Sequence, residues 1–387
     1  MRRILAAMAV ALLLPACAQA AQIVMAIEED EIGGSRLAVF SAAADTIDTV
    51  PGQETQPDAV MMAIDAQIEA RFAQQKAKVA INRGTVMQTG SVWQDGKTAS
   101  MALTWQGEQA DGSDGCTSMG LTVNLETGEE ILLHQLFSDW DGAQAAMETI
   151  ITDDVLDGMS DYMEYGDLLP MPTDNYAFDD FGLTVYWPED RYRYFDGTSG
   201  SVTFYWHELA DYIDENSPVC ALAHPDAQYN ASEIEALCMS GEVTSMLTLK
   251  LGELLGDTAG RYRLADPDYT TDALVYPLEC MRGFAVEIPK YAETEEEQTP
   301  VSAVRASRVS MAGMLTTGKT TEQEVRALLG EPAREQDYDE DEAFDAMLPP
   351  GRSLLYEIAG RVLQAHFDER GVLACVILRS AMPEGLY

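Results

Sequence analysis

The residues from Gly313 to Thr320 spell G-x-x-x-x-G-K-T, the pattern of a loop that binds phosphate groups. The chain after Thr320 is too short for the doubly wound sheet that such a loop serves, and no apolar strand ending in aspartate follows to hold magnesium. The same letters also predict the start of a helix, with Thr320 or Thr321 as its cap and Gln323 or Glu324 completing a capping box. We therefore expect no nucleotide and no cofactor at this loop.

The stretch HELAD, His207 to Asp211, begins like the helix of a zinc protease but has no second histidine. It predicts a buried corner between a strand and a helix. The other histidines are far apart, so no metal site is expected. No G-x-S-x-G elbow for a nucleophilic serine is present. A hydrolase, the least favoured alternative, would need a buried carboxylate pair with separated pKa values. We predict no catalytic residue and a protein that is not an enzyme.

One segment has the composition of a recognition loop. It combines two arginines, two tyrosines and a phenylalanine, the residue types that dominate binding hot spots. The alternative is a loop folded onto its own sheet. The binding residues predicted from this segment are Arg191, Tyr192, Arg193, Tyr194 and Phe195.

The charge of the chain limits its partners. The 387 residues include 65 Asp and Glu against 24 Lys and Arg, a net charge of -41. Phosphate backbones and anionic membrane surfaces would be repelled, so nucleic-acid binding is excluded. Two acidic runs, Asp337–Glu342 and Glu293–Glu297, are predicted to be solvated loops, since their spacing does not fit a calcium-binding EF-hand. The charge either solvates the surface or attracts a basic partner.

The first twenty residues predict export. Arg2 and Arg3 precede a short apolar run, and Ala18-Gln19-Ala20 is a small-x-small cleavage site. The alternative is a lipoprotein signal in which Cys17 is lipidated. No later run is long and apolar enough to span a bilayer. The expected location is periplasmic or extracellular, or else a lipid anchor at the outer membrane.

Export permits disulfide bonds. Five cysteines follow the signal, so at least one thiol remains free unless it pairs between molecules. Cys220 and Cys238 flank a short segment and are the predicted bridge.

Periodicity predicts an alternation of helices and strands. Apolar residues at three- and four-residue spacing predict a helix over 57–75, whereas alternation and an Asp-Gly turn predict strands over 78–125. The stretch 121–137 predicts a strand, a tight turn and a short helix. The remaining expected elements are a helix over 140–156, strands over 179–187 and 201–206, and a helix over 208–213.

This order of elements resembles the extracytoplasmic domains of the anti-sigma factor RsiV and the peptidoglycan deacetylase PdaC, over about residues 22–217. The matching residues are Val123 to Gly128, Leu136, Phe137, Gly182, Leu183, Tyr186, Trp187, Gly200 and Val202 to Leu209, whereas Tyr176 and Asp179 depart from the pattern. The resemblance implies recognition of lysozyme. The chain has neither the transmembrane helix of RsiV nor the catalytic domain of PdaC, so neither activity is carried over whole.

The C-terminal part contains a weak internal repeat, Leu251–Asp257 and Val325–Glu331. It predicts two small helix-and-sheet units. The second resembles the BamE (SmpA/OmlA) envelope proteins and the tandem fold of β-lactamase inhibitor protein, on Thr317 to Val325 and Leu328 to Pro332, with Tyr356, Phe367, Asp368 and Gly371 to Leu373. Those families bind proteins and catalyse no reaction.

The sequence therefore predicts an α+β protein with a signal peptide (1–20), an RsiV/PdaC-like domain (22–217), a helical connector (218–242) and two small units (243–310 and 311–387). The predicted function is non-enzymatic binding of an envelope macromolecule, with a basic protein such as lysozyme as the candidate. Cell-wall glycan binding or modification is the alternative.

Overall fold

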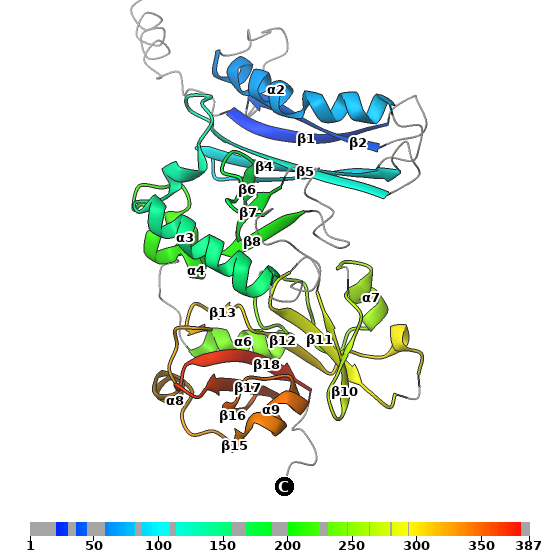
Figure 1. Cartoon of the computed structure of the whole chain (residues 1–387), viewed down its shortest axis with the longest axis vertical. Coiled ribbons are helices and arrows are strands. Elements are labelled where there is room, and N and C mark those ends of the chain that lie inside the picture. Colours follow the sequence, from blue (N-terminus) through cyan, green and yellow to red (C-terminus); the bar gives the residue numbers. More distant parts are fainter. Residues whose placement is uncertain are drawn as a thin grey trace, which may run out of the picture. The chain divides into compact units, whose positions relative to one another are not determined.

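A computed structural model of the chain describes residues 21–29, 36–44, 59–81, 87–108, 114–156, 168–187, 200–224, 231–245, 247–262, 264–278, 281–292 and 294–380. The predicted α+β class is confirmed (Figure 1). Contacts divide the chain into two compact units. Unit 1 comprises 1–135, 172–179 and 185–192, and unit 2 comprises 136–171, 180–184 and 193–387. These limits differ from the domain boundaries predicted from the sequence, which stay predictions.

Unit 1 is built on a five-stranded sheet in the order β1-β2-β3-β4-β5. All neighbours pair antiparallel except β2 and β3, which meet in parallel. The predicted hairpin is confirmed: Asp95 accepts hydrogen bonds from the N–H groups of Lys97 and Thr98 (2.8 Å each) and closes the turn between β3 and β4. The strands are β1 (Ala21–Glu29), β2 (Arg36–Ala44), β3 (Met87–Gln94), β4 (Thr98–Glu108) and β5 (Asp114–Asn124).

Helix α2 (Ala59–Ile81) covers one face of this sheet (Figure 1). Ile64 and Ile68, one helical turn apart, are buried in one cluster with Met101 of β4 and Leu121 of β5. This is the apolar stripe that the sequence predicts for the segment, and its burial drives the helix onto the sheet. Arg71 fixes the helix further through an ion pair with Glu130.

The predicted strand, turn and helical piece over 121–137 is also confirmed. After β5, the side chain of Asn124 accepts hydrogen bonds from the N–H groups of Glu126 (2.8 Å) and Thr127 (3.0 Å). Gly128 adopts φ +74°, a conformation that favours glycine, and completes the turn. A 3₁₀ turn, η1 (Leu133–Leu136), follows.

Short helices and strands follow the five-stranded sheet along the sequence and precede the eight-stranded sheet of unit 2. The predicted helix over 140–156 is α3 (Trp140–Ile150), capped by Asp139, continued as the π-helical turn η2 (Ile151–Leu156). The next strands form a three-stranded sheet in the order β6-β7-β8. The elements are β6 (Tyr176–Phe178), β7 (Gly182–Tyr186), β8 (Ser201–Tyr205), α4 (Trp206–Leu209), η6 (Ala210–Tyr212), α5 (Cys220–Ala223) and α6 (Ala231–Ser240).

The C-terminal half of unit 2 is one eight-stranded antiparallel sheet in the order β15-β16-β17-β18-β12-β11-β10-β9. The repeat halves meet where β12 pairs with β18, so they share one sheet, and the predicted tandem of small units stays a prediction. The elements are α7 (Leu255–Ala259), β9 (Asp268–Tyr269), β10 (Ala273–Pro277), β11 (Phe284–Pro289), η7 (Glu296–Gln298), β12 (Ala303–Ala306), β13 (Ser310–Met311), β14 (Leu315–Thr316), α8 (Glu322–Leu329), β15 (Arg334–Tyr338), α9 (Glu340–Ala346), β16 (Gly351–Ile358), β17 (Arg361–Asp368) and β18 (Leu373–Arg379).

The two faces of this sheet differ in chemistry. Because side chains alternate along a strand, Val304 and Ala306 face a large apolar core, which α6 and α8 complete through Ile234 and Val325. The intervening Arg305 faces the opposite side. A smaller apolar cluster there includes Ala343 of α9. The second face therefore combines buried polar groups with a helix that covers them.

The capping box predicted at the start of α8 is present. Thr321 is the N-cap; its N–H donates to the carboxylate of Glu324 (2.8 Å), and its hydroxyl accepts from the N–H of Glu324 (3.4 Å).

Thr321→Ala should lower the free energy of unfolding by about 1 kcal/mol because it removes this cap. Urea unfolding measures the change. Thr271→Ala, at an exposed threonine, is the control; an equal loss in both variants would contradict the assignment.

The prediction of a solvated loop over Asp337–Glu342 is wrong. Asp337 and Tyr338 end β15, and Asp339 is the N-cap of α9, accepting a hydrogen bond from the N–H of Glu342 (2.9 Å). Carboxylates in the first turn of a helix interact favourably with its dipole, so this acidic run stabilises a helix. In the second acidic run, Glu296 and Glu297 lie in the short turn η7 (Glu296–Gln298), and Glu293 lies outside the described residues.

Within the described segments, no helix is long and apolar enough to cross a membrane.

The predicted disulfide is not formed, since Cys220 and Cys238 both carry free thiols. Cys238 lies on α6 with its side chain buried in the apolar core of unit 2, whereas Cys220 is half-buried at the start of α5. The burial of Cys238 raises its pKa to about 12, which makes it a poor nucleophile.

Candidate functional site

Several predicted site residues lie outside the described part of the chain. They are Cys17 of the signal segment and the recognition loop of Arg191, Tyr192, Arg193, Tyr194 and Phe195. Their roles stay predictions. Among the described residues, no group of three or more His, Cys, Asp or Glu is arranged to hold a metal ion.

The loop from Gly313 to Thr320 does not have the form of a phosphate cradle. Its backbone N–H groups are used within the fold: Gly318 donates to Leu373 (2.8 Å), and Lys319 and Thr320 both donate to Thr316 (3.2 and 2.9 Å). A phosphate loop needs these donors to point at its ligand. The segment is instead the hairpin of β13 and β14 followed by the start of α8.

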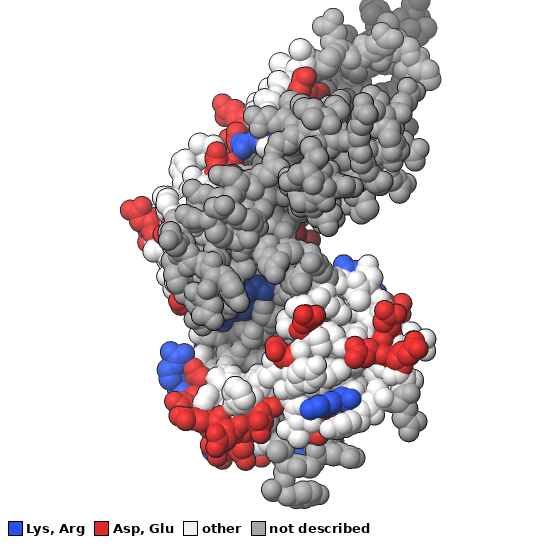
Figure 2. Space-filling model, turned by 45° about the vertical axis from the view of Figure 1, so that its right-hand side comes forward, with Lys and Arg blue, Asp and Glu red and all other residues white. Residues whose placement is uncertain are grey.

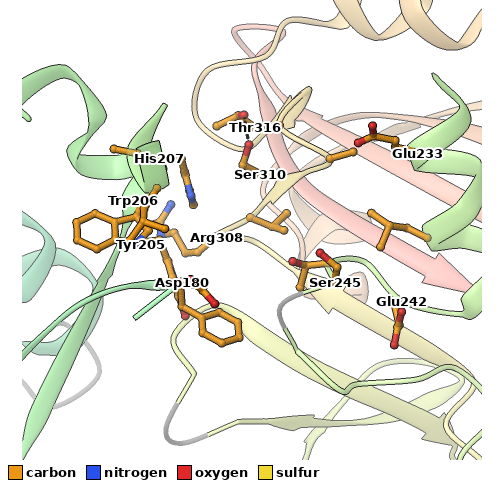
Figure 3. A pocket seen from close by; sticks show the side chains of 18 of the residues that line it. Asp180, Tyr205, Trp206, His207, Glu233, Glu242, Ser245, Arg308, Ser310 and Thr316 are labelled. Carbon is orange, nitrogen blue, oxygen red and sulfur yellow. Dashed lines mark hydrogen bonds between the residues drawn. The ribbon is translucent and has the colours of Figure 1, made fainter. Parts of the chain in front are cut away.

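A cleft of about 770 Å³ lies within unit 2 (Figure 3). This volume is in the range of sites for small organic ligands. Its walls come from the β8–α4 corner, α5, α6 and the β13–β14 hairpin, with Phe181, Leu237 and Val309 among the apolar residues. Tyr205, Trp206 and Phe284 also line it, but their rings are buried, so they offer little face for stacking on a sugar.

One end of the cleft gathers basic side chains with carboxylates beside them, among them Asp180 (Figure 3). We call Arg282, Arg308 and Lys319, together with the ring of His207, the cationic corner. Arg308 and Lys319 line the cleft with side chains that are 38% and 47% exposed. Burial, together with the charges of Lys319, Arg282 and Arg308, lowers the pKa of His207 to about 4. His207 is therefore neutral at pH 7.

Two carboxylates neutralise part of this corner. Glu208 forms an ion pair with Arg282 and lies 3.9 Å from Arg308, and Asp211 lies 3.3 Å from Lys319. Glu208 also accepts a hydrogen bond from the N–H of Tyr205 (2.9 Å), which fixes the start of α4. The HELAD stretch is thus the predicted corner between a strand and a helix, but its histidine and glutamate face arginines and a lysine.

A second candidate surface is α9. Four of its seven residues are carboxylates, none is basic, and none of the four forms an ion pair with another described residue. Phe344 lies among them with 82% of its surface exposed, and Met347 follows. We call these residues the α9 surface: Glu340, Asp341, Glu342, Phe344, Asp345 and Met347. Figure 2 shows Asp and Glu gathered in dense groups over the described surface, with few Lys and Arg.

The end of α9 is held on the sheet by buried polar groups. Arg305 donates to the carbonyl groups of Ala346 (2.9 Å) and Met347 (3.2 Å), which satisfies acceptors at the helix C-terminus. His366 bonds through Nε2 to the carbonyl of Pro349 (2.8 Å) and through Nδ1 to the hydroxyl of Ser353 (2.9 Å). The turn after α9 therefore has fixed anchors, and the exposed Phe344 is presented on a supported helix.

Among the described residues, the one buried carboxylate is Glu287, and it forms ion pairs with Arg305 and Arg379. Burial by itself raises the pKa of Glu287, but the charges of Arg379 and Arg305 outweigh it, and the pKa is lowered. Glu287 accepts from Arg379 at 2.7 Å and forms an ion pair with Arg305. A general acid at pH 7 needs the opposite shift. This site therefore gives no support to a hydrolase mechanism.

Comparisons with known proteins give a limited picture. No family model matches the chain, and no curated protein matches it. Solved structures with some likeness include a DUF4309 family protein, YjgB, from Bacillus subtilis (13% identity, TM-score 0.29, 39% of this chain and 95% of that chain). Two DUF3298 family proteins are also similar. One is from Pseudomonas aeruginosa (10% identity, TM-score 0.31, 51% and 94%) and one from Bacteroides fragilis (11% identity, TM-score 0.30, 53% and 97%). TM-scores of this size assign neither fold nor function.

Proposed function

We propose that this chain is an exported, non-enzymatic protein that binds a cationic macromolecule through the α9 surface. The observation that carries the proposal is Phe344, an aromatic side chain that is 82% exposed among carboxylates without ion pairs. An aromatic anchor with matched charge around it is the common composition of a binding hot spot. The resemblances to RsiV/PdaC-type and BamE-type proteins agree with a binding role but are not needed for it.

The charges fit this partner class. A net charge of -41 speeds the approach of a basic protein and repels nucleic acid and anionic lipid. On α9, the aromatic ring can contact the aliphatic or cationic part of a lysine or arginine while the neighbouring carboxylates pair with its charge. Lysozyme, a basic protein of the envelope environment, is the partner that we test.

Calorimetric titration of the mature protein with lysozyme should give saturable binding at about 0.15 M and, more weakly, at about 0.5 M salt. Diffuse attraction alone fades as the Debye length shrinks below ~8 Å. Phe344→Ala should weaken the complex by about tenfold or more, as expected for a central anchor. Tyr291→Ala, at an aromatic residue that is 81% exposed outside α9, is the matched control and should bind like the wild type.

Two results would contradict the proposal. If binding disappears at the higher salt, the acidic surface acts only as a diffuse field. If Phe344→Ala and Tyr291→Ala bind lysozyme with the wild-type affinity, α9 is not the docking surface, whatever the partner. The export part is tested separately by the intact mass of protein purified from its own cells, because cleavage after Ala20 and acylation of Cys17 give different masses.

A further inference from the structure

We propose that helix α9 and the turn after it open from the sheet when His366 takes up a proton, so that the α9 surface is held in place at neutral pH and opens more often in mild acid. The opening is a property of unit 2 alone. Its effect on a partner deepens the proposed function and rests on it, because only a partner bound at the α9 surface would be affected.

A series of hydrogen bonds leads from Arg379 on β18 to the turn after α9. Arg379 donates through Nε to the side-chain oxygen of Gln364 (3.1 Å). The amide nitrogen of Gln364 donates to the hydroxyl of Ser353 (2.9 Å), and that hydroxyl lies 2.9 Å from Nδ1 of His366. Nε2 of His366 lies 2.8 Å from the carbonyl oxygen of Pro349. The imidazole is therefore the last link between the sheet and the turn.

The two ends of this series fix the protons within it. A guanidinium can only donate, and a peptide carbonyl can only accept. Nε2 therefore carries the proton of the neutral ring and donates it to Pro349. Nδ1 is then an acceptor, and the hydroxyl of Ser353, which accepts from Gln364, donates its own proton to Nδ1. The neutral imidazole satisfies both of its neighbours, and no position is left for a second proton.

A proton added at Nδ1 would disrupt this arrangement. It would place an N–H group against the hydroxyl of Ser353, so the hydroxyl proton would have to turn away from its acceptor. His366 is 0% exposed, and burial lowers its pKa, as does the positive charge of Arg305. The bond to Pro349 and the charge of Asp368 act in the opposite direction but do not outweigh burial. Hydration of the charged ring therefore requires its cover to open.

The cover over His366 is α9 with the turn that follows it. His366 pairs in register with Ser353 of β16 and Cys375 of β18, so the three side chains share one face of the sheet. Ala343 of α9 and Leu348 of the turn pack with Cys375 in the small apolar cluster on that face. Strand β17 is paired along both sides, whereas α9 is seven residues long. The helix is therefore the part that opens at the lower free-energy cost.

Other titratable groups share this face. Burial raises the pKa of the Tyr338 hydroxyl and of the Cys375 thiol, so both stay neutral below pH 7.5. Burial opposes the ionisation of Glu287 and Asp368, but arginine charges and hydrogen bonds outweigh it and lower the pKa of each, so both stay charged at pH 5.5. The remaining charged groups on the surrounding elements are Arg305, Arg379 and the exposed carboxylates of α9, Glu340, Asp341, Glu342 and Asp345.

The direction of the pH dependence follows from the two forms of the ring. In the opened form His366 meets water, and its pKa returns to the ordinary value near ~6.5. In the closed form its pKa is lower. The closed form therefore has its full stability above pH ~6.5 and loses it as the pH falls toward the closed-form pKa. The opening constant should be about fivefold to tenfold larger at pH 5.5 than at pH 7.5.

Hydrogen exchange of the full mature chain measures this opening directly. The amides of Ala343, Met347 and Leu348 form hydrogen bonds within α9 and its ends. Their protection factors should fall about fivefold to tenfold between pH 7.5 and pH 5.5. They should also be lower than those of β17 at both pH values, because α9 opens without the sheet. NMR signals of the imidazole, assigned in labelled protein, should show that His366 is still neutral at pH 5.5.

The variant His366→Gln isolates the ring. Glutamine can donate to Pro349 and accept from Ser353, but it takes up no proton in this pH range. The protection factors of α9 in this variant should change less than about twofold between the two pH values. His224→Gln, at an exposed histidine of the same unit, is the matched control and should keep the wild-type dependence. Both variants retain every carboxylate and arginine around the ring.

The proposal is overturned if α9 is equally protected at both pH values, if His366→Gln keeps the wild-type dependence, or if α9 exchanges as slowly as β17. A charged His366 at pH 5.5 with α9 still fully protected would also overturn it. That measurement uses the wild type, so misfolding of His366→Gln does not remove the test. Lysozyme is absent from all these experiments, so the opening and the binding by Phe344 can fail separately.

Discussion

Glu287→Gln is expected to destabilise unit 2 by about 3–5 kcal/mol, the usual cost of breaking a buried ion pair. Glu287 is 1% exposed, and both its oxygens are used by Arg305 and Arg379. A neutral amide would leave two arginines beside the core without their counter-charge. The loss should be visible as a lower urea midpoint, and hydrogen exchange should increase in β11, β12 and β18, the strands that carry these three residues.

The control for this prediction is Glu369→Gln, an exposed carboxylate in the turn after β17, which should change stability by less than about 0.5 kcal/mol. If Glu287→Gln has an equally small effect, the three residues do not form a stabilising cluster. Replacing all three with apolar residues of similar size should recover much of the loss, because no buried charge then remains. The recovery should be incomplete, since Arg305 also caps α9.

Acid should remove the same contribution from the wild type. The folded-state pKa of Glu287 is lowered, so the unfolded chain takes up its proton first as the pH falls. The stabilisation is present above the unfolded pKa of a glutamate, near ~4.3. It is lost as the pH falls from there toward the folded pKa. Glu287→Gln has already lost it, so the stability gap between variant and wild type should narrow over this range.

Gly120→Ala is expected to lower the free energy of unfolding of unit 1 by about 3 kcal/mol or more. A Cβ at this position would lie 2.1 Å from the backbone oxygen of Tyr176, where β6 crosses β5. Moving the backbone away from this contact would break hydrogen bonds that hold the two strands together. The N–H of Gly120 donates to the side chain of Asn175 (2.9 Å), and Asn175 also donates to the carbonyl of Tyr186 (3.1 Å). Hydrogen exchange in β5 and β6 should therefore rise along with the drop in the urea midpoint.

Gly260→Ala is the matched control for the close approach. Gly260 has an ordinary helical backbone, and a Cβ there would meet nothing closer than 3.4 Å. It should leave the stability within about 0.5 kcal/mol of the wild type. If Gly120→Ala changes the stability equally little, β5 and β6 lie farther apart at Gly120 and Tyr176 than in this structure.

The sequence predicts a structural element correctly where all the residues that stabilise the element lie within one short segment. The alternation and the Asp95–Gly96 turn determine the β3–β4 hairpin, and the spacing of Ile64 and Ile68 determines the buried stripe of α2. Thr321 and Glu324 determine the start of α8 because both partners of the capping box lie within one turn. A second box, Asp339 with Glu342, follows the same rule, but the density of carboxylates led to the wrong prediction of a loop.

Pairings between distant segments depended on the tertiary structure. Nothing in the local pattern around Glu287 says that its face of the sheet is covered, or that Arg305 and Arg379 lie on the neighbouring strands β12 and β18. The free thiols of Cys220 and Cys238 are a similar case, since short sequence separation did not bring them into a bond. The cleft joins His207 to Arg308 and Lys319, about a hundred residues later, and only the joining of β8, α6 and the β13–β14 hairpin makes it visible.

The sequence by itself determined the α+β class, the main helices and strands, the helix starts and the acidic character of the surface. Backbone hydrogen bonding and side-chain periodicity act over a few residues, so the sequence displays them directly. Only the tertiary structure decided which carboxylate is buried, which glycine is crossed by another strand and which cations meet at one end of a cleft. Those outcomes depend on which sheet faces are covered and which strands become neighbours, and that choice is made by packing over the whole unit.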